Sequence, residues 1–433
     1  MKDNLVIFWF RRDLRLKDNA GLFHALNEND KVLPIFIYDK NTLDKLNKSD
    51  HRVDFIEYSL KKLNDLLKKN NKSISIYYGK PVKVFSELIK KYNVTKVYSN
   101  KDYTPYSIKR DKKVEELLKV NNIDFNSYKD HVLFEKYEVV KDDNTPYKVY
   151  TPFSRKWLIK MSENKIDFFN SEKYIYKFFN EKRGFLTLKE IGFEKSILSP
   201  LNLNLSSDTI NNYEKTRNFP YVNGTSKIGL HLRFGTISTR EMIVKAEVSK
   251  NKTFLKELVW REFFQQILFH YPHTINKSFK PKYDRIEWLN NENQFKKWCS
   301  GQTGYPLVDA GMRELNQTGF MHNRVRMLVG SFLCKHLLID WRWGEAYFAK
   351  KLYDYETASN VGNWQWVAGC GVDASPYFRI FNPHEQIKKF DKNLIYTKKW
   401  VPEFESDQYV EPIVIHKDAR ERCLLTYKKA LNN

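Results

Sequence analysis

The stretch LVIFWF at residues 5–10 is followed directly by RRDLRLKDN at residues 11–19. Six consecutive apolar residues are typical of a strand that is buried on both faces of a parallel sheet. A dinucleotide-binding fold would place a GxGxxG turn directly after such a strand, but segment 11–19 contains no glycine. The sequence therefore predicts a parallel α/β domain that lacks the dinucleotide fingerprint.

Strand-like and helix-like segments alternate over the first 130 residues, as in a parallel sheet whose strands are joined by helices. Apolar runs predict strands at 5–10, 32–38, 73–79 and 96–100. Amphipathic periodicity predicts helices at 52–69, 82–92 and 106–120. We therefore expect a Rossmann-like α/β domain over 1–130, with helices on both faces of the sheet.

The rest of the chain changes character twice. Periodicity is lost between residues 131 and 205, where prolines interrupt polar runs, so we expect a long interdomain connector on the surface there. From residue 206 onward, helices are predicted at 239–250, 252–270, 291–299, 306–317, 320–338, 343–353, 384–392 and 416–431. Eight of the ten tryptophans also lie in this part. These features predict a larger all-α domain over 206–433.

The composition narrows the partners and the compartment. The 433 residues include 74 Lys and Arg against 52 Asp and Glu, and the net charge of +22 suits a polyanion such as nucleic acid as well as it suits a solvated lysine-rich surface. Four cysteines without paired spacing indicate a reducing compartment. No apolar run reaches the roughly 20 residues of a membrane helix, and MKDNLVIFWF is strand-like rather than a signal peptide. We expect a cytoplasmic monomer that contacts no membrane.

Two helical segments carry polar residues on an otherwise apolar background. FLKELVWREFF (254–264) places Glu257, Trp260, Arg261 and Phe264 on one helical face, where an Arg–Glu pair beside a core tryptophan is a slightly better explanation than a binding site. GFMHNRVRMLVGSFL (319–333) begins polar and ends apolar, as expected of a helix that runs from a pocket into a core.

A third segment, GTSKIGLHLRFGTIS (224–238), places hydroxyl side chains before a predicted helix. Free backbone N–H groups at such a position bind anions such as phosphate, although an ordinary capped turn is the commoner explanation. His270 and His273 have the spacing of metal ligands but no third ligand nearby, so no metal site is expected. The sequence has no GxSxG motif and no P-loop, and hydrolytic or phosphoryl-transfer machinery is therefore not visible.

The stretch ASNVGNWQW (358–366) contains two tryptophans separated by one residue. If the stretch is helical, Trp364 and Trp366 point to nearly opposite faces, because neighbours on a helix surface are three or four residues apart. They cannot then both face one core, and one of them is expected to face a ligand or a cavity.

Several long motifs in the same order resemble the DNA photolyase and cryptochrome family, most closely its class I cyclobutane pyrimidine dimer photolyases. The N-terminal motif is RRDLRLKDN (11–19), the central one is TGYPLVDAGMRELNQTGFMHNRVRM (303–327), and the last is NVGNWQWVAGCGVDASPYFRIFNP (360–383). The likeness extends from the first strand to KKWVPEF (398–404), which is nearly the whole chain. It implies an antenna domain over 1–130 and a helical catalytic domain that binds both FAD and DNA over 206–433.

The resemblance implies a set of flavin contacts. Residues that match the family's FAD-binding positions are Tyr213, Thr225, Ser226, Lys227, Ile228, Gly229, Arg261, Asn323, Arg326, Asp354, Tyr355, Glu356 and Asn360. Asn360 would lie beside the reactive flavin nitrogen, and Arg326 and Asp354 would pair beside the ring. The Thr-Ser segment would hold the diphosphate. The cofactor would carry the chemistry while the protein positions it.

The implied reaction is light-driven repair of cyclobutane pyrimidine dimers by electron transfer from reduced FAD to a flipped-out lesion, and photolyases are established base-flipping enzymes. The catalytic residues would be Glu257, which stabilises charge on the dimer, and Asn360. Residues at the family's lesion- and DNA-binding positions are Arg217, Glu257, Trp260, Asn323, Arg324, Met327 and Trp366. The residues that match its electron-transfer chain are Trp364, Trp341 and Trp288, in order from the flavin outward.

Three other functions are alternatives to the repair of cyclobutane pyrimidine dimers. A blue-light receptor of the cryptochrome type is disfavoured by Asn360, by the retained pair Trp260 and Trp366, and by the absence of a long tail after the flavin domain. Repair of six-four photoproducts would be expected to need two histidines where this sequence has Asn323 and Met327. A binding-only flavoprotein that senses redox state stays open, and it would cause no light-dependent change in damaged DNA.

Two departures from the family pattern affect the cofactors. The phosphate segment reads TSKIG where the family has a final serine, so Gly229 offers only its backbone N–H. Folate-binding relatives carry an acid near the position of Tyr106 and Ser107, which have no carboxylate. The antenna chromophore is therefore left open among folate, deazaflavin, a second flavin or none.

Overall fold

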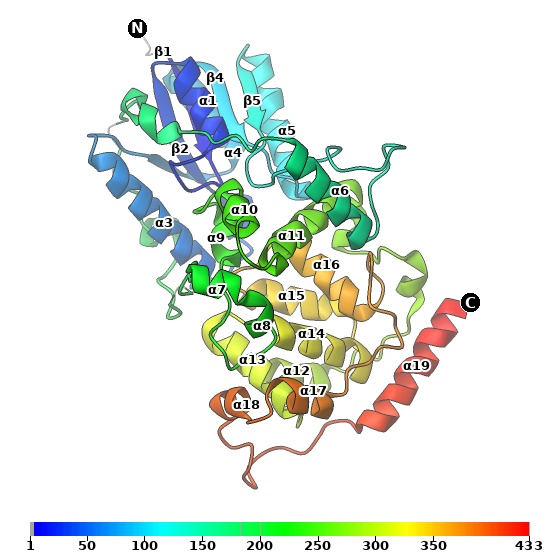
Figure 1. Ribbon diagram of the computed structural model, residues 1–433. Coiled ribbons are helices and arrows are strands. Elements are labelled where there is room, and N and C mark those ends of the chain that lie inside the picture. Colours follow the sequence, from blue (N-terminus) through cyan, green and yellow to red (C-terminus); the bar gives the residue numbers. More distant parts are fainter. Residues whose placement is uncertain (1–3, 182, 200, 433) are drawn as a thin grey trace. The chain divides into compact units, whose positions relative to one another are not determined.

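The computed structural model of the protein describes residues 4–181, 183–199 and 201–432 (Figure 1). The chain forms two compact units that are built from non-contiguous segments. The first contains Met1–Glu138, Leu158–Pro200 and Gly229–Lys245, and the second contains Val139–Trp157, Leu201–Ile228 and Ala246–Asn433. The contiguous ranges expected from the sequence, 1–130, 131–205 and 206–433, stay a proposal about domains.

The first unit contains a five-stranded sheet in which every neighbouring pair is parallel. Its strands are β1 (Asn4–Phe10), β2 (Val32–Asp39), β3 (Ser75–Gly79), β4 (Asn93–Asn100) and β5 (Asp124–Tyr128), in the order β3-β2-β1-β4-β5. The α/β prediction is confirmed. Strand β5 was not predicted, because its sequence DFNSY is largely polar and it lies at the edge of the sheet.

Helices cover both faces of the sheet. Alternate β1 residues Leu5, Ile7 and Trp9 pack in one core with α4 (Pro81–Lys91) and α5 (Pro105–Val120). On the opposite face, the Tyr98 hydroxyl of β4 donates to Glu28 of α1 (Ala20–Glu28) at 2.7 Å. The two remaining helices of this part of the chain are α2 (Lys40–Leu43) and α3 (His51–Lys68).

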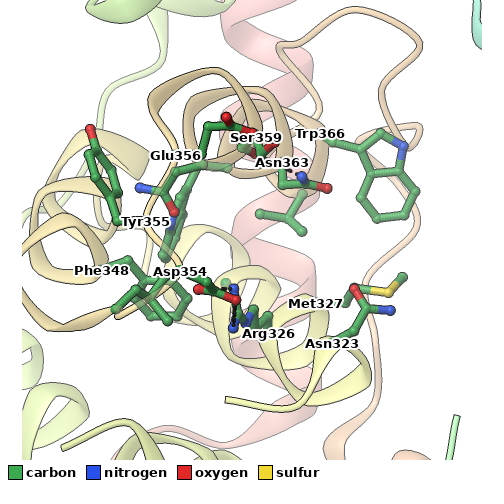
Figure 2. A pocket seen from close by; sticks show the side chains of 15 residues that line it. Asn323, Arg326, Met327, Phe348, Asp354, Tyr355, Glu356, Ser359, Asn363 and Trp366 are labelled. Atoms are coloured by element: carbon green, nitrogen blue, oxygen red, sulfur yellow. Dashed lines mark hydrogen bonds and ion pairs between the residues drawn. The ribbon is translucent and has the colours of Figure 1, made fainter. Parts of the chain in front are cut away.

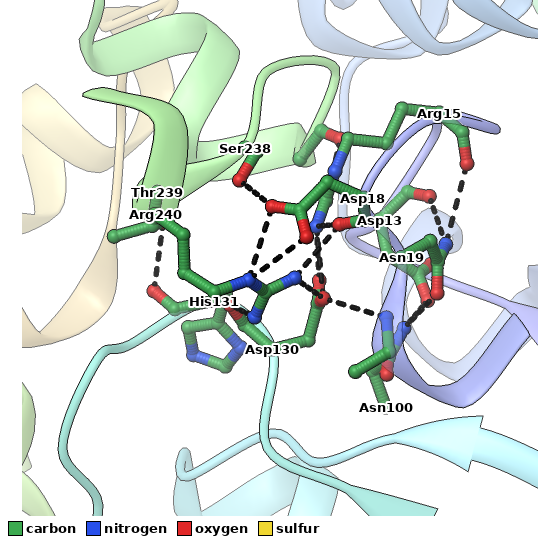
Figure 3. Close-up of polar contacts among 12 residues, drawn as sticks. Asp13, Arg15, Asp18, Asn19, Asn100, Asp130, His131, Ser238, Thr239 and Arg240 are labelled. Carbon is green, nitrogen blue, oxygen red and sulfur yellow. Dashed lines mark hydrogen bonds and ion pairs between the residues drawn. The ribbon is translucent and has the colours of Figure 1, made fainter. Parts of the chain in front are cut away.

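The segment 11–19 forms a buried ion-pair network directly after β1 (Figure 3). Arg15 donates to both carboxylate oxygens of Asp130, at 2.8 and 2.7 Å, and Arg240 bonds both Asp18 and Asp130. Asn19 caps α1 by accepting from the N–H of Leu22. Buried charges are tolerated only when they are paired, so this segment ties the turn after β1 to Asp130 and Arg240.

The helices that follow β5 are α6 (Tyr150–Glu163), α7 (Ser207–Asn211), α8 (Tyr213–Thr216), α9 (Gly229–Phe234), α10 (Thr239–Glu247), α11 (Thr253–His270), α12 (Glu292–Ser300), α13 (Pro306–Thr318), α14 (Asn323–Ser331), α15 (Trp341–Lys351), α16 (Thr357–Ala368), α17 (Pro383–Phe390), α18 (Ile395–Trp400) and α19 (His416–Asn432). Short 3₁₀ turns occupy Ser171–Lys177, Lys189–Ile191, Pro272–Ile275 and Pro281–Arg285, and a π turn spans Phe332–His336. Among the described residues, no helix is long and apolar enough to cross a membrane.

Two stretches differ from the sequence-based expectation. Helix α6 lies within the range expected to be a connector, and its Pro152 is tolerated because a first-turn residue needs no intrahelical N–H bond. The helix expected at 320–338 is shorter. His322 caps α14 by accepting from the N–H of Arg324, and α14 passes into the π turn after Ser331.

The core of the second unit surrounds α16. Trp364 packs against Phe348 and Trp298, with ring centroids 5.0 and 6.2 Å apart. This packing depends on glycine at position 344 of α15, because a Cβ there would lie 2.2 Å from the Trp364 ring. Gly362 of α16 similarly leaves room for the ring of Phe264 on α11. The two glycines let α16 approach both neighbouring helices closely.

Replacing Asp130 with alanine should destabilise the protein, because it leaves two buried guanidiniums without their shared carboxylate. Removal of one partner of a buried ion pair typically costs about 3–5 kcal/mol, which urea unfolding can measure. Burial by itself raises the pKa of Asp130. The positive charges of Arg15 and Arg240 outweigh this effect and lower the pKa of Asp130 to about 2. The carboxylate therefore stabilises fully above the unfolded pKa of about 3.9, and its contribution is lost as the pH falls toward 2.

The matched control is Asp65→Ala, which removes an exposed carboxylate paired with Lys68. Its effect should be within about 0.5 kcal/mol. Equal stability losses in the two variants would contradict the role of Asp130.

Candidate functional site

Helix α16 (Thr357–Ala368) points its side chains in several directions because its period is 3.6 residues. Ser359, Asn363 and Trp366 share one face, at spacings of four and three residues. Asn360 and Trp364 lie on another face of the helix, and Trp364 is buried whereas Trp366 is only partly buried, although both line the first cavity. Gly369 ends the helix in the left-handed region with φ of 89°.

Two cavities adjoin this helix. The first cavity, of about 130 Å³, is lined by Asn323, Arg326, Met327, Gly330, Phe348, Leu352, Asp354, Tyr355, Glu356, Ser359, Asn360, Asn363, Trp364, Trp366 and Val367 (Figure 2). The second cavity, of about 270 Å³, is lined by Arg217, Glu257, Trp260, Arg261, Phe264, Asn323, Met327, Ser359, Asn363 and Trp366. Five residues line both, so the two cavities share a wall.

The first cavity combines an apolar wall with a charged edge. Arg326 bonds both carboxylate oxygens of Asp354, at 3.2 and 2.9 Å, and its Nε donates to the carbonyl of Met321. Such two-pronged pairs hold a guanidinium in one orientation. Trp364 and Phe348 line the cavity from the apolar side. The arrangement suits a planar aromatic ligand with polar atoms along one edge.

Asn360 is held by a residue that sequence analysis did not identify. Its Nδ2 donates to the Glu345 carboxylate at 2.9 Å and to the Glu345 carbonyl at 3.3 Å. Both contacts use the amide nitrogen, so the Asn360 Oδ1 remains available to the cavity that Asn360 lines. Burial raises the pKa of Glu345. Its position on α15, in contact with α16, was not evident from local sequence.

The second cavity has aromatic walls and a charged rim. Trp260 and Trp366 line it together with the ion pair formed by Arg217 and Glu257. Arg261 pairs with Glu356 at 3.0 and 3.1 Å. The sequence analysis favoured an Arg–Glu pair beside a core tryptophan, but Arg261 pairs with Glu356 of another segment and Trp260 is only half-buried.

Tyr150 stacks on Trp260 with ring centroids 3.6 Å apart and an interplanar angle of 6°. Its hydroxyl donates to the carbonyl of Lys256, and its N–H donates to Asp373. Burial, followed by the nearby Glu257, raises the Tyr150 pKa. Sequence analysis missed Tyr150 because it precedes Pro152 in a stretch without clear periodicity, and a ring contact over 110 positions leaves no local pattern.

The expected phosphate segment lies in an irregular loop before α9. Ser226 is buried, and Lys227 adopts a left-handed backbone with φ of 53°. The ammonium of Lys227 and the guanidinium of Arg326 both lie over the ring of Phe320, at 5.6 and 5.4 Å. Thr225 and Ile228 belong to the same loop, whereas Gly229 is the first residue of α9 and falls in the first unit.

Tyr213 and Arg324 are among the sequence-predicted residues that line neither cavity. Tyr213 lies beneath the guanidinium of Arg217, 5.3 Å from it, and burial raises its pKa to about 12. Arg324 donates to Asn218 at 2.6 Å and lies over the ring of Phe390. Arg324 is therefore partly buried on α14, the helix that supplies Asn323 and Met327 to the second cavity, but it does not line that cavity.

The three predicted electron-transfer tryptophans share one core but differ in burial. Trp364 lines the first cavity, Trp341 is buried at the start of α15, and Trp288 is partly buried against the same cluster. Trp298, which sequence analysis assigned no role, is the indole whose ring contacts Trp364. Trp288 instead contacts Tyr427 of α19, with centroids 6.0 Å apart.

Comparison with known proteins finds the same likeness along the whole chain. The family model described as DNA photolyase matches residues 6–168, and that described as the FAD-binding domain of DNA photolyase matches residues 254–408. A deoxyribodipyrimidine photo-lyase of Alkalihalophilus pseudofirmus is 35% identical over 475 aligned positions, covering 98% of this chain and 98% of the relative.

Two solved structures are similar throughout. A bacterial class III photolyase from Agrobacterium tumefaciens has 32% identity and a TM-score of 0.86, covering 100% of this chain and 99% of that chain. An archaeal photolyase from Sulfolobus tokodaii, solved with two FAD molecules, has 35% identity and a TM-score of 0.85, covering 98% of this chain and 100% of that chain.

Proposed function

The chain belongs to the DNA photolyase family, and we propose that it uses FAD and light to repair cyclobutane pyrimidine dimers in ultraviolet-damaged DNA. The observation that carries this proposal is the shared wall between the two cavities. One cavity suits a flavin ring, the other suits a pair of stacked bases, and α16 contributes to both. Electron transfer between two ligands requires them to lie close together, and a shared wall between their cavities would place them so.

The residues of the first cavity fit FAD. A flavin ring has an apolar body and a polar edge, and the cavity offers Trp364 and Phe348 for the body and the Arg326–Asp354 pair for the edge. When bound in its reduced form and excited by light, FAD supplies the electron that opens the cyclobutane ring. The Asn360 Oδ1 would accept a hydrogen bond from the reactive edge of the ring, while Glu345 holds the Asn360 amide nitrogen.

Other residues would hold the rest of the cofactor. Thr225, Ser226 and the backbone N–H groups of Lys227 and Ile228 would bind the diphosphate, because hydroxyls and free N–H groups in a loop before a helix bind anions. Arg261 would contribute a positive charge that Glu356 orients. Tyr213, Gly229, Asn323 and Tyr355 complete the proposed cofactor set.

The second cavity would hold the flipped dimer. Trp260 and Trp366 would pack against the two bases, because indole faces hold bases without regard to sequence. Glu257 would hydrogen-bond the dimer and stabilise developing charge. The Arg217–Glu257 ion pair orients that carboxylate before DNA binds. Arg217 and the partly buried Arg324 would contact phosphates beside the lesion, while Asn323 and Met327 complete the pocket.

We further propose Trp364, Trp341 and Trp288 as the path that re-reduces the flavin. An indole is oxidisable. Trp364 and Trp341 are buried in one core, and Trp288 is partly buried against it. Trp364 is the ring that borders the first cavity, as the inner member of such a path must.

A second chromophore would bind at the carboxyl edge of the sheet in the first unit. The strand order reverses direction between β1 and β4, and ligands of open α/β sheets bind at such a switch point. The Trp9 indole N–H is buried there without a partner among the described residues, between the guanidiniums of Arg11 and Arg110. The Sulfolobus relative holds two FAD molecules, so we favour a flavin over folate. An absorption spectrum of the purified protein would identify a second chromophore.

The compartment, the oligomeric state and the class within the family are also proposals. We propose that the protein works in the cytoplasm as a monomer of class I type. All four cysteines carry free thiols, which supports a reducing compartment. The receptor alternative gains no better support than repair from the comparisons, because the relatives reported above are photolyases.

Repair itself is tested with irradiated oligothymidylate, a reductant and blue light. The purified protein should restore the absorbance of intact thymines in the light and not in the dark. No loss of dimers in the light would contradict the proposed function and favour a receptor or a redox sensor.

Asp354→Ala should weaken FAD binding, because Arg326 loses the carboxylate that orients it. Hydrogen bonds to charged groups contribute about 1.5–3 kcal/mol, so the affinity for FAD should fall roughly ten- to hundredfold. The measurement is the ratio of bound flavin to protein after gel filtration. Asp284→Ala, which breaks another Arg–Asp pair outside both cavities, should retain FAD. Equal flavin loss in both variants would show that the effect is not local.

Tyr150→Ala should weaken binding of dimer-containing DNA, because Trp260 loses the ring that holds it in place. Aromatic pairs contribute about 0.5–1.5 kcal/mol beyond their buried area, so the Kd should rise roughly two- to tenfold. Tyr150→Phe keeps the stacked ring and should bind nearly as well as the parent. If Tyr150→Phe bound dimer-containing DNA as weakly as Tyr150→Ala, the hydroxyl of Tyr150 and not its ring would be responsible for the binding.

A further inference from the structure

Asn363 lines both cavities but has no part in the roles proposed above. It follows Ser359 by four residues and precedes Trp366 by three, so it lies on the face of α16 that borders the second cavity. The residue is exposed, whereas Trp364 beside it is buried. Figure 2 shows its side chain next to Trp366, across from Asn323 and Met327.

The orientation of the Asn363 amide is determined by one contact. Its Nδ2 donates to the backbone carbonyl of Ser359 at 2.8 Å. A carbonyl can only accept, so the nitrogen must face Ser359 and the Oδ1 must face away from it. A side-chain amide has two N–H donors and an acceptor oxygen. One N–H and the Oδ1 therefore remain for a ligand.

The supporting segment is itself held in place. The Ser359 hydroxyl donates to Glu356 at 3.4 Å, and Glu356 pairs with Arg261 at 3.0 Å. The first turn of α16 is thus tied to α11, and the carbonyl that orients Asn363 belongs to this turn. Asn363 projects from a rigid element, which is what a residue that discriminates between ligands requires.

We propose that Asn363 is a specificity-determining residue of the dimer site, whose amide pairs with the imide edge of one pyrimidine. This inference rests on the proposed function. Thymine and uracil present an N3–H donor between two carbonyl acceptors, so an amide can accept from N3–H and donate to either carbonyl side by side. Asparagine makes the equivalent two-bond contact with the edge of adenine.

Cytosine would be recognised less well. Its N3 is an acceptor and its C4 carries an amino donor, so the amide would have to turn over to pair with it. Turning over would break the bond from Nδ2 to Ser359. A dimer also has two bases, and Asn323 of α14 lines the same two cavities. The geometry therefore supplies one amide for each base.

The test is Asn363→Leu, which removes both polar atoms while keeping the number and branching of the side-chain heavy atoms. The Kd for a thymine-dimer oligonucleotide should rise about three- to tenfold, which corresponds to the loss of a neutral hydrogen bond or two. The KM of repair should rise while the rate at saturating substrate stays unchanged. FAD content and affinity for undamaged DNA should match the parent. The preference for thymine dimers over cytosine-containing dimers should narrow.

Asn121→Leu is the matched control. Asn121 is exposed at the end of α5 in the first unit, and its Nδ2 donates to the carbonyl four residues earlier at 2.8 Å, as in Asn363. This variant should bind and repair dimers as the parent does. If Asn363→Leu also binds dimers with unchanged affinity, or if it loses FAD, Asn363 is not a dimer contact. If the unmodified protein did not bind dimers at all, the proposed function itself would be contradicted. That result differs from the one in which the unmodified protein and Asn363→Leu bind dimers equally well, which would contradict only the role of Asn363.

Discussion

The helical period of α16 is the constraint on which the candidate site depends. Because 3.6 residues make one turn, Thr357–Ala368 presents a buried face to the core, Asn360 and Trp364 to the first cavity, and Ser359, Asn363 and Trp366 to the wall that the two cavities share. Asn360 and Trp364 line the first cavity alone, whereas Asn363 and Trp366 line both. In the proposed function, this one helix would set the separation between the cofactor and the lesion, which governs electron transfer between them.

Close helix packing keeps α16 in this position. Gly344 and Gly362 remove the side chains that would otherwise separate α16 from α15 and α11. The approach of α15 brings Glu345 within reach of Asn360, and the approach of α11 brings Trp260 to the same cavity as Trp366. Interiors pack as densely as organic crystals, so a displacement of one helix would be felt at both cavities.

Arginine–aspartate ion pairs occur in both units, in different surroundings. In the first unit, Arg15 and Asp18 occupy the place where a dinucleotide-binding fold has glycines, and they join the turn after β1 to Asp130 and Arg240. In the second unit, Arg326 and Asp354 border a cavity, where a fixed ion pair can stabilise a ligand's charge. The same kind of ion pair stabilises the fold in the first unit and borders the proposed cofactor site in the second.

The amino-acid sequence by itself determined the parallel sheet, most of the helices and the family, because apolar periodicity is local and the family motifs are long. It also separated Trp364 from Trp366, since that argument needs only the helical period. Strand β5, helix α6, Tyr150, Glu345, Ser359 and Asn363 were not identified from it. Asn363 and Ser359 could have been found by stepping back three and seven residues from Trp366, but nothing in the sequence says which face of α16 borders a cavity. That was decided by the tertiary structure alone, because stacking on Trp260 and the bond from Asn360 to Glu345 join segments that are distant along the chain or on different helices.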